Sequence, residues 1–292
     1  MVQLSKNTLE YTLNNGVKIP AVGLGTWQSA KNDAYTATVT ALKNGYKHID
    51  TAAIYGNEEE VGQGIIDSKV DRKDIFVTTK LWNADHKQIE KALQTSLDKL
   101  KLDYVDLYLI HWPCSTDPAT KEAYPDWNFV DTYIGLQKLV DSGKVRAIGV
   151  SNFTLKKLQK VFDHPEFKIV PAVNQIEAHP LLKQQELFEF LNKHNILIEA
   201  YSPLGSTNSP LFKNKTINEI ATKNNVEPAQ VLISWAIKRG TVVLPKSVTD
   251  SRIISNLETF DLSEEDFSTL NKLEEIDGTV RTCDPGFNDF ST

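Results

Sequence analysis

Cysteine is scarce in this sequence, which contains only Cys114 and Cys283 among 292 residues. Two cysteines are too few for the disulfide framework of a small secreted domain or for a zinc site made of thiolates. Both fall in irregular segments that we expect near the active site, so oxidation of these thiols is one hypothesis for tuning activity. Two thiols without a special role are the preferred interpretation.

Long apolar runs are also missing. No segment reaches the length of a membrane span, and the first residues, MVQLSKNTLEYTL, lack the apolar stretch of a signal peptide. The formal net charge is only -6, with 24% charged residues, so no broad basic face for nucleic acid is expected. We expect a cytoplasmic monomer, since no apolar surface stripe calls for an oligomer, with neither a membrane nor a nucleic acid as partner.

Several motifs of common enzyme classes are absent. The sequence has no G-x-G-x-x-G fingerprint, no P-loop, no G-x-S-x-G elbow and no H-E-x-x-H pair. These absences argue against a Rossmann domain, a serine nucleophile and a zinc hydrolase, and we expect no metal. The pair Gly62 and Gly64 falls within a predicted helix, where spacing for packing is the better interpretation.

Apolar strand-like runs alternate with amphipathic helical patterns along the whole chain. The eight candidate strands cover residues 21–25, 46–50, 75–80, 105–110, 145–150, 171–175, 196–200 and 241–244. Strands that are apolar on both faces and separated by helices indicate parallel pairing. Eight such units in a chain of 292 residues are typical of a (β/α)8 TIM barrel. An open doubly wound sheet is the competitor, and the missing glycine fingerprint disfavours it. We expect one domain over residues 1–292.

The turn signal Asn14-Asn15-Gly16 lies between two short strand-like runs and predicts an N-terminal β-hairpin from residues 8–13 and 17–19. Two irregular segments, Pro113 to Trp127 and Thr279 to Thr292, are expected near the strand ends. Helices are expected to begin at residues that resemble caps, namely Asp85, Thr154, Thr216 and Ser263.

Polar residues follow the carboxyl ends of the predicted strands: Asp50 with Tyr55, Lys80, His111, Ser151 with Asn152, Gln175, Tyr201 with Ser202, and Lys246 with Ser247. The carboxyl ends of barrel strands meet at one mouth, where barrel enzymes place their active sites. Each residue alone has an ordinary structural explanation, such as capping a strand or packing at the rim. Their common register favours an active site.

These residue types predict a chemistry. A lysine beside a tyrosine lowers the pKa of the phenol, and a carboxylate paired with the lysine holds it in place. We therefore expect Tyr55 to donate a proton near neutral pH, assisted by Lys80 and Asp50, while a neutral His111 orients a carbonyl oxygen. Reduction of a carbonyl without metal or nucleophile requires a hydride source, which indicates a nicotinamide.

Other residues of this set are suited to hold that nicotinamide. Tyr201 would stack on its ring, and Ser151, Asn152 and Gln175 would bind its carboxamide. Lys246 and Arg252 would bind a ribose phosphate.

The chain resembles the aldo-keto reductase superfamily along essentially its whole length. Three segments carry the resemblance: GYKHIDTAAIYGNEEEVG (45–62), VRAIGVSNF (145–153) and LPKSVTDSRIISN (244–256). Within the superfamily the chain is most similar to fungal NADPH-dependent glycerol dehydrogenase-like enzymes and carbonyl reductases. The resemblance implies a catalytic tetrad of Asp50, Tyr55, Lys80 and His111, and NADPH bound without a Rossmann fold.

The resemblance also implies a set of binding residues. The nicotinamide and pyrophosphate side would be contacted by Thr26, Asp50, Ser151, Asn152, Gln175, Tyr201, Ser202, Leu204 and Ser206. The adenosine 2′-phosphate end would be held by Lys246, Ser247, Thr249, Arg252 and Asn256. Trp27, Trp82 and Trp112, with Tyr55 and His111, would line the substrate site, and the tail from Arg281 to Thr292 loosely resembles a C-terminal specificity loop.

We therefore predict an NADPH-dependent reductase of aldehydes and ketones, with glyceraldehyde, dihydroxyacetone, ketoesters and aromatic ketones as candidate substrates. An aldose reductase of the xylose type and an NADPH-sensing regulatory subunit with little turnover are the alternatives. A metal-dependent barrel hydrolase is disfavoured, because the sequence contains no cluster of metal ligands.

Overall fold

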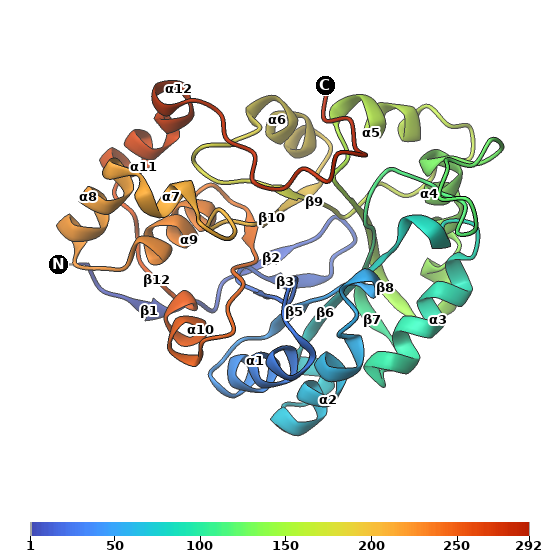
Figure 1. Ribbon diagram of the computed structural model, residues 1–292, viewed down its shortest axis with the longest axis horizontal. Coiled ribbons are helices and arrows are strands. Elements are labelled where there is room, and N and C mark those ends of the chain that lie inside the picture. Colours follow the sequence, from blue (N-terminus) through green and yellow to red (C-terminus); the bar gives the residue numbers. More distant parts are fainter. Residues whose placement is uncertain (1, 292) are drawn as a thin grey trace.

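The computed structural model describes residues 2–291, and its centre is a parallel sheet with the strand order β11-β10-β9-β8-β7-β6-β5-β4 (Figure 1). Isolated parallel bridges from Val22 to Val243 and from Gly25 to Lys246 join the first strand to the last. The sheet thus closes on itself, which confirms the predicted (β/α)8 barrel. The strands are β4 (Leu24–Gly25), β5 (His48–Asp50), β6 (Phe76–Leu81), β7 (Val105–Ile110), β8 (Val145–Ser151), β9 (Val173–Glu177), β10 (Leu197–Tyr201) and β11 (Val242–Val243).

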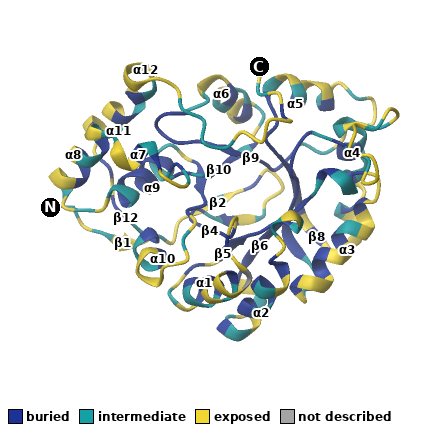
Figure 2. Cartoon of the chain, in the orientation of Figure 1, coloured by how far each residue is buried: buried dark blue, intermediate teal, exposed yellow. Residues whose placement is uncertain are grey.

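Helices surround this barrel, with buried inner faces and exposed outer faces (Figure 2). They are α1 (Lys31–Lys43), α2 (Glu58–Ser68), α3 (Ile89–Leu100), α4 (Phe129–Gln137), α5 (Leu155–Phe162), α6 (Gln185–Lys193), α7 (Pro210–Lys213), α8 (Lys215–Asn224), α9 (Pro228–Lys238), α10 (Asp250–Asn256), α11 (Glu264–Asn271) and α12 (Leu273–Asp277). The short 3-10 turns are η1 (Ala53–Tyr55), η2 (Arg72–Asp74), η3 (Asn83–Asp85) and η4 (Val140–Ser142). None of the helices within residues 2–291 combines the length and apolar character needed to cross a membrane.

The predicted N-terminal hairpin is confirmed by the antiparallel pairing of β2 (Glu10–Thr12) with β3 (Lys18–Pro20). It lies against the amino-terminal ends of the barrel strands, since Asn14 donates to the carbonyl oxygen of Pro171 at 3.0 Å and Asn15 to that of Arg146 at 2.9 Å. Apolar hairpin side chains join a cluster with residues of the barrel strands: Leu13, Ile19, Phe76, Leu107, Leu109, Val173 and Leu244. The hairpin therefore closes the end opposite the predicted site. A second small sheet pairs β1 (Ser5–Lys6) with β12 (Glu258–Thr259).

Two of the four predicted helix starts are confirmed. The side chains of Thr154 and Ser263 accept the backbone N–H groups that cap α5 and α11. The other two predictions are wrong. Asp85 belongs to the 3-10 turn η3 and α3 begins after Gln88. Thr216 lies inside α8, because the Asn214 side chain, two residues earlier, accepts from the N–H of Ile217 and caps the helix.

Helix α2 packs closely against the carboxyl end of α3. A Cβ atom added to Gly62 would lie 2.3 Å from the carbonyl oxygen of Leu100, a distance that the α3 backbone must move to relieve. The interpretation of this glycine as a packing residue is therefore confirmed.

We expect Gly62→Ala to lower the free energy of unfolding by about 2 kcal/mol, because overpacking against backbone forces a helix to shift. The matched control is Gly135→Ala in α4, whose added Cβ would meet only the flexible end of the Ile89 side chain, at 2.6 Å. Its overlap is offset by the better helix propensity of alanine. Urea denaturation of both variants tests this, and equal stabilities would contradict it.

Candidate active site

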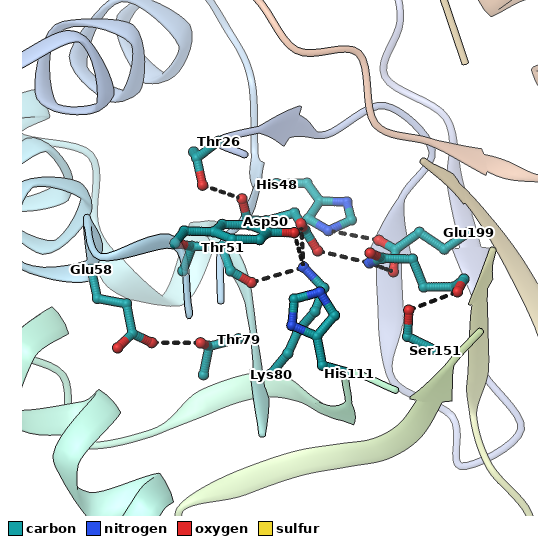
Figure 3. A network of polar contacts seen from close by, with 12 residues as sticks. Thr26, His48, Asp50, Thr51, Glu58, Thr79, Lys80, His111, Ser151 and Glu199 are labelled. Atoms are coloured by element: carbon teal, nitrogen blue, oxygen red, sulfur yellow. Dashed lines mark hydrogen bonds and ion pairs between the residues drawn. The ribbon is translucent and has the colours of Figure 1, made fainter. Parts of the chain in front are cut away.

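The site is organised around Lys80, whose side chain is fully buried on β6. Its Nζ lies 2.6 Å from Oδ1 of Asp50 on the neighbouring strand β5, and it donates to the carbonyl oxygen of Thr51 at 2.9 Å. The same ammonium donates to the hydroxyl of Tyr55 at 3.3 Å. Figure 3 shows Lys80 pointing toward Asp50 and Thr51, with His111 beside it. Four predicted residues thus meet at the carboxyl ends of β5, β6 and β7.

The loop after β5 holds Tyr55 in this position. Gly56 ends the 3-10 turn with a positive φ of 68°, a conformation that glycine adopts without strain. The next residue, Asn57, is buried and donates to the carbonyl oxygens of Thr26 and Ser29 at 3.0 and 3.2 Å. The loop that carries Tyr55 is therefore fastened to the loop that follows β4.

The ion pair keeps Lys80 charged. Burial is the largest single influence and favours the neutral amine, but the charge of Asp50, the Tyr55 phenol, the hydrogen bond to Asp50 and the charge of Glu199 together outweigh it, so the pKa of Lys80 is raised above its ordinary value. Burial also raises the pKa of Asp50, and the nearby ammonium opposes that rise. Each group thus supplies the charge that makes burial of the other tolerable.

The structure corrects the expected pKa of Tyr55. Burial raises it to about 12, and the positive charge of Lys80 offsets only part of that rise. The prediction of a net lowered pKa is therefore wrong, because the loss of water around the phenol outweighs the attraction of Lys80 for the phenolate. A phenol with this pKa carries its proton at neutral pH and is able to donate it.

His111 lies next to this hydroxyl, with its ring centroid 5.6 Å from that of Tyr55 and 5.5 Å from that of Trp82. Burial, and to a lesser degree the charge of Lys80, holds the pKa of His111 well below its usual range. The imidazole is therefore neutral, as expected, and one ring N–H is available to an acceptor. Its backbone is held by Asn152, whose amide donates to the His111 carbonyl oxygen at 3.0 Å.

A buried polar network continues below the ion pair. The amide of Gln175 donates to Oδ2 of Asp50 at 2.8 Å and to Oε2 of Glu199 at 2.9 Å. The other oxygen of Glu199 lies 3.2 Å from Nε2 of His48, and both side chains are fully buried. The sequence reasoning missed His48 and Glu199. Both could have been found in the sequence, because each is a titratable residue inside an otherwise apolar predicted strand.

The expected nicotinamide-side residues are linked to this network. Thr26 donates to the carbonyl oxygen of Asp50 at 2.8 Å, and Ser151 donates to that of Gln175 at 2.8 Å. The hydroxyl of Tyr201 donates to the side-chain oxygen of Asn152 at 2.7 Å. The remaining three residues follow β10 in the loop that leads to α7: Ser202, Leu204 and Ser206.

The expected phosphate-binding residues form a separate group between the end of β11 and the last turn of α10: Lys246, Ser247, Thr249, Arg252 and Asn256. Lys246 and Arg252 are exposed, and neither forms an ion pair with a carboxylate in the described part of the chain. Lys246 donates only to the carbonyl oxygen of Gln28, at 3.4 Å. Two unpaired cations beside hydroxyl groups suit a phosphate.

The rings of Trp82 and Trp112 lie beside His111, and together with the ring of Phe287 they are called the aromatic wall below. Phe287 from the C-terminal tail contacts Trp112 and Trp82, with ring centroids 5.3 and 6.4 Å apart, and Phe290 lies 6.2 Å from Trp112. Trp27 is 38% exposed. The sequence reasoning did not single out Phe287 or Phe290, because nothing local showed which side chains of an irregular tail pack against Trp82 and Trp112.

The two cysteines are both free thiols. Cys114 lies 3.6 Å from the carbonyl oxygen of Phe287. Burial raises the pKa of both thiols, which disfavours the reactive thiolate. Within residues 2–291, no three histidine, cysteine, aspartate or glutamate side chains are grouped so that they could hold a metal ion.

Comparison with known proteins places this geometry in context. Residues 21–275 match the family model described as aldo/keto reductase family. The chain is 50% identical to the glycerol 2-dehydrogenase (NADP(+)) of Saccharomyces cerevisiae, with 98% of this chain and 97% of that protein covered. It is 47% identical to the aldehyde reductase YPR1 of the same yeast, with the same coverage. It is 45% identical to the D-galacturonate reductase of Hypocrea jecorina, with 89% of each chain covered.

The ion pair predicts a large stability effect. We expect Lys80→Met to lower the free energy of unfolding at neutral pH by about 3–5 kcal/mol, because it leaves the Asp50 carboxylate buried without its counter-charge. Adding Asp50→Asn should recover part of that loss. Urea titrations of wild type, both single variants and the double variant measure the coupling.

The deficit of Lys80→Met should also shrink as the pH falls from 7 toward about 5. In wild type, burial raises the pKa of Asp50 and the Lys80 ammonium opposes that rise; Lys80→Met removes the opposition, so the pKa of Asp50 in the folded variant is higher still. The folded variant therefore binds a proton at a higher pH than folded wild type does, and it gains stability relative to wild type as the pH falls. A deficit that is independent of pH, or a double variant no more stable than Lys80→Met, would contradict the ion-pair account.

Proposed function

The chain belongs to the aldo/keto reductase family, and from that premise we propose that it reduces aldehydes and ketones to alcohols with NADPH, using Tyr55 as the proton donor. An oxidoreductase that acts on CH–OH groups with NADP is the activity class that the family and its named relatives support. The observation that carries the proposed mechanism is the position of the Lys80 ammonium, 2.6 Å from Asp50 and 3.3 Å from the Tyr55 hydroxyl.

In the proposed reduction, Tyr55 gives its proton to the carbonyl oxygen of the substrate as that oxygen gains negative charge. Lys80 stabilises the phenolate that remains, through its bond to the Tyr55 oxygen. Asp50 keeps the ammonium in place and charged. In the reverse direction the phenolate accepts the proton of the alcohol, so the same three residues serve both directions.

His111 supports the same step as a neutral donor. A neutral imidazole is able to hydrogen-bond a carbonyl oxygen and orient it toward Tyr55 without adding a second positive charge beside Lys80. The ring of Trp82 contacts the His111 ring from another side, which limits the positions the imidazole can take.

The residues present fit NADPH. The unpaired cations Lys246 and Arg252 supply donors for the 2′-phosphate, and the Tyr201 ring, whose hydroxyl is held by Asn152, supplies an aromatic surface for the nicotinamide. When bound, NADPH supplies the hydride.

For the substrate we propose small hydroxyaldehydes and hydroxyketones of the glycerol type, together with ketoesters and aromatic carbonyl compounds. The first group follows from the similarity to the yeast glycerol 2-dehydrogenase (NADP(+)). The aromatic wall of Trp82, Trp112 and Phe287 supports the last group.

We further propose a single-domain monomer that acts in the cytoplasm. Its two free cysteines agree with a reducing compartment. Sedimentation of the purified chain decides the oligomeric state, and a fluorescent fusion decides the compartment.

Removing the proton donor should stop the reaction without preventing cofactor binding. We expect Tyr55→Phe to lower kcat by about 10³-fold, the usual scale for a general acid, with the dissociation constant for NADPH changed by less than about twofold. Loss of nicotinamide absorbance measures turnover, and quenching of tryptophan fluorescence measures binding.

The matched control is Tyr11→Phe. Burial also raises the pKa of Tyr11 to about 12, but this phenol lies in the hairpin at the opposite end of the barrel and should not affect turnover. Normal turnover by Tyr55→Phe would refute its role. A wild-type protein that binds NADPH tightly but reduces no carbonyl would instead favour a regulatory subunit.

The phosphate site predicts selectivity between cofactors. We expect Arg252→Ala to weaken NADPH binding by about tenfold, because a charge-assisted hydrogen bond to a phosphate is lost, and to leave NADH binding unchanged. Fluorescence titrations with both cofactors measure the two constants. Lys215→Ala, which removes an exposed cation on α8, is the control. Equal weakening of both cofactors would argue against a 2′-phosphate contact.

A further inference from the structure

The C-terminal tail, residues 280–291, turns back from α12 across the carboxyl end of β9 and ends beside α5 (Figure 1). It contains no helix or strand between residues 280 and 291. Its backbone first contacts the barrel where the N–H of Val280 donates to the carbonyl oxygen of Leu181 at 2.9 Å. Side-chain contacts must therefore fix the rest of the tail.

Glu177, the last residue of β9, holds the start of this tail, Thr282 and Cys283, which we call its root. Its Oε1 accepts both the backbone N–H and the hydroxyl of Thr282 at 2.7 Å, and its Oε2 accepts the N–H of Cys283 at 2.9 Å. The carboxylate is fully buried, and Nε2 of His179 lies 2.9 Å from Oε1. Burial alone would raise the pKa of Glu177, but these hydrogen bonds lower it overall, so the anionic acceptor persists at neutral pH.

The root determines where the aromatic part of the tail lies. Arg281, next to Thr282, stacks on the ring of Phe290 at 3.8 Å. The Phe290 ring contacts Trp112. Phe287, which precedes it by three residues, contacts both Trp112 and Trp82. A shift of the root would therefore move the side chains that complete the aromatic wall.

A second anchor holds the far end. Lys157 on α5 donates to the side-chain oxygen of Asn288 at 2.8 Å and to the carbonyl oxygen of Asp289. The bond to Asn288 is part-buried and the bond to Asp289 is exposed, whereas the Glu177 carboxylate is fully buried. Since hydrogen bonds to a buried charge are the more costly to lose, the root contributes more to the position of the tail.

We propose that Glu177 is a positioning residue for substrate selectivity: it fixes the tail so that Phe287 completes the aromatic wall for carbonyl compounds that carry an aromatic group. This inference rests on the proposed function. Glu177 does not contact Asp50, Tyr55, Lys80 or His111 through any hydrogen bond or ion pair of the described residues, so the proton transfer itself should not depend on it.

The test compares Glu177→Gln with wild type on benzaldehyde and on glyceraldehyde. The amide replaces one acceptor oxygen by a donor, which then faces a backbone N–H that has lost its partner. We expect KM for benzaldehyde to rise about tenfold with kcat nearly unchanged, and both constants for glyceraldehyde to stay within about twofold. Thr282→Val, which removes only the hydroxyl bond, should shift the benzaldehyde KM in the same direction by less.

Phe287→Ala separates positioning from a general structural effect. It should reproduce the benzaldehyde defect of Glu177→Gln, and the double variant should be no worse than Phe287→Ala alone, because both changes remove the same wall. Hydrogen exchange should show faster exchange at Thr282 and Cys283 in Glu177→Gln but not in Phe287→Ala.

Equal losses on both substrates, additive effects in the double variant, or unchanged exchange at Thr282 and Cys283 would each overturn the proposal. If Glu177→Gln does not fold, Thr282→Val is measured with the same substrates and the same hydrogen exchange, and its result decides whether the proposal stands. A wild type that reduces neither substrate would refute the proposed function, and the exchange experiment would still show whether Glu177 fixes the tail.

Discussion

An ammonium group without exposure to water is the constraint on which this barrel depends. Lys80 is fully buried, and a lone buried charge is far more costly than folding can tolerate. Asp50, one strand away, offsets that cost at 2.6 Å. The parallel register pairs Asp50 with Thr78, and Lys80, two residues further along β6, lies on the same face of the strand as Thr78. Tyr55 therefore lies beside the Lys80 ammonium, which the barrel stabilises before any substrate is bound. The site is therefore preorganised by the same contact that makes the core stable.

The ion pair does not stand alone, because the barrel buries a second carboxylate below it. Gln175 donates to both Asp50 and Glu199 and so lies between two negative groups that would otherwise repel each other. Both ring nitrogens of His48 lie near oxygen atoms: Nε2 is 3.2 Å from Glu199 and Nδ1 is 3.1 Å from the Pro20 carbonyl oxygen. This arrangement explains why titratable residues interrupt apolar strands in the middle of the barrel.

The elements and the strand-end residues could be predicted because both depend on local pattern. Apolar runs and strand ends are visible in the sequence, and eight strand ends converge in any barrel. The net pKa of Tyr55 could not be predicted, since it depends on how far the surrounding protein removes water from the phenol. The contact of Glu177 with Thr282 could not be predicted either, because the two residues are 105 positions apart and the tail that carries Thr282 has no periodic pattern. Even the start of α3 was misplaced by three residues, because a 3-10 turn at Asp85 imitates a helical cap.

The division between barrel and tail has a consequence for how chemistry and selectivity are combined. Strands hold the ion pair of Lys80 and Asp50, and the loop after β5 holds the proposed proton donor Tyr55, whereas an irregular segment supplies Phe287. Gln175 and Glu177 lie on the same face of β9, two residues apart, since side chains alternate along a strand. Because Gln175 donates to Asp50 and Glu177 accepts from Thr282, one short stretch of β9 positions both the Asp50 carboxylate and the root of the tail. Sequence changes in the tail can alter the aromatic wall while Asp50 and Lys80 remain in place, and the wall still begins at a fixed distance from them.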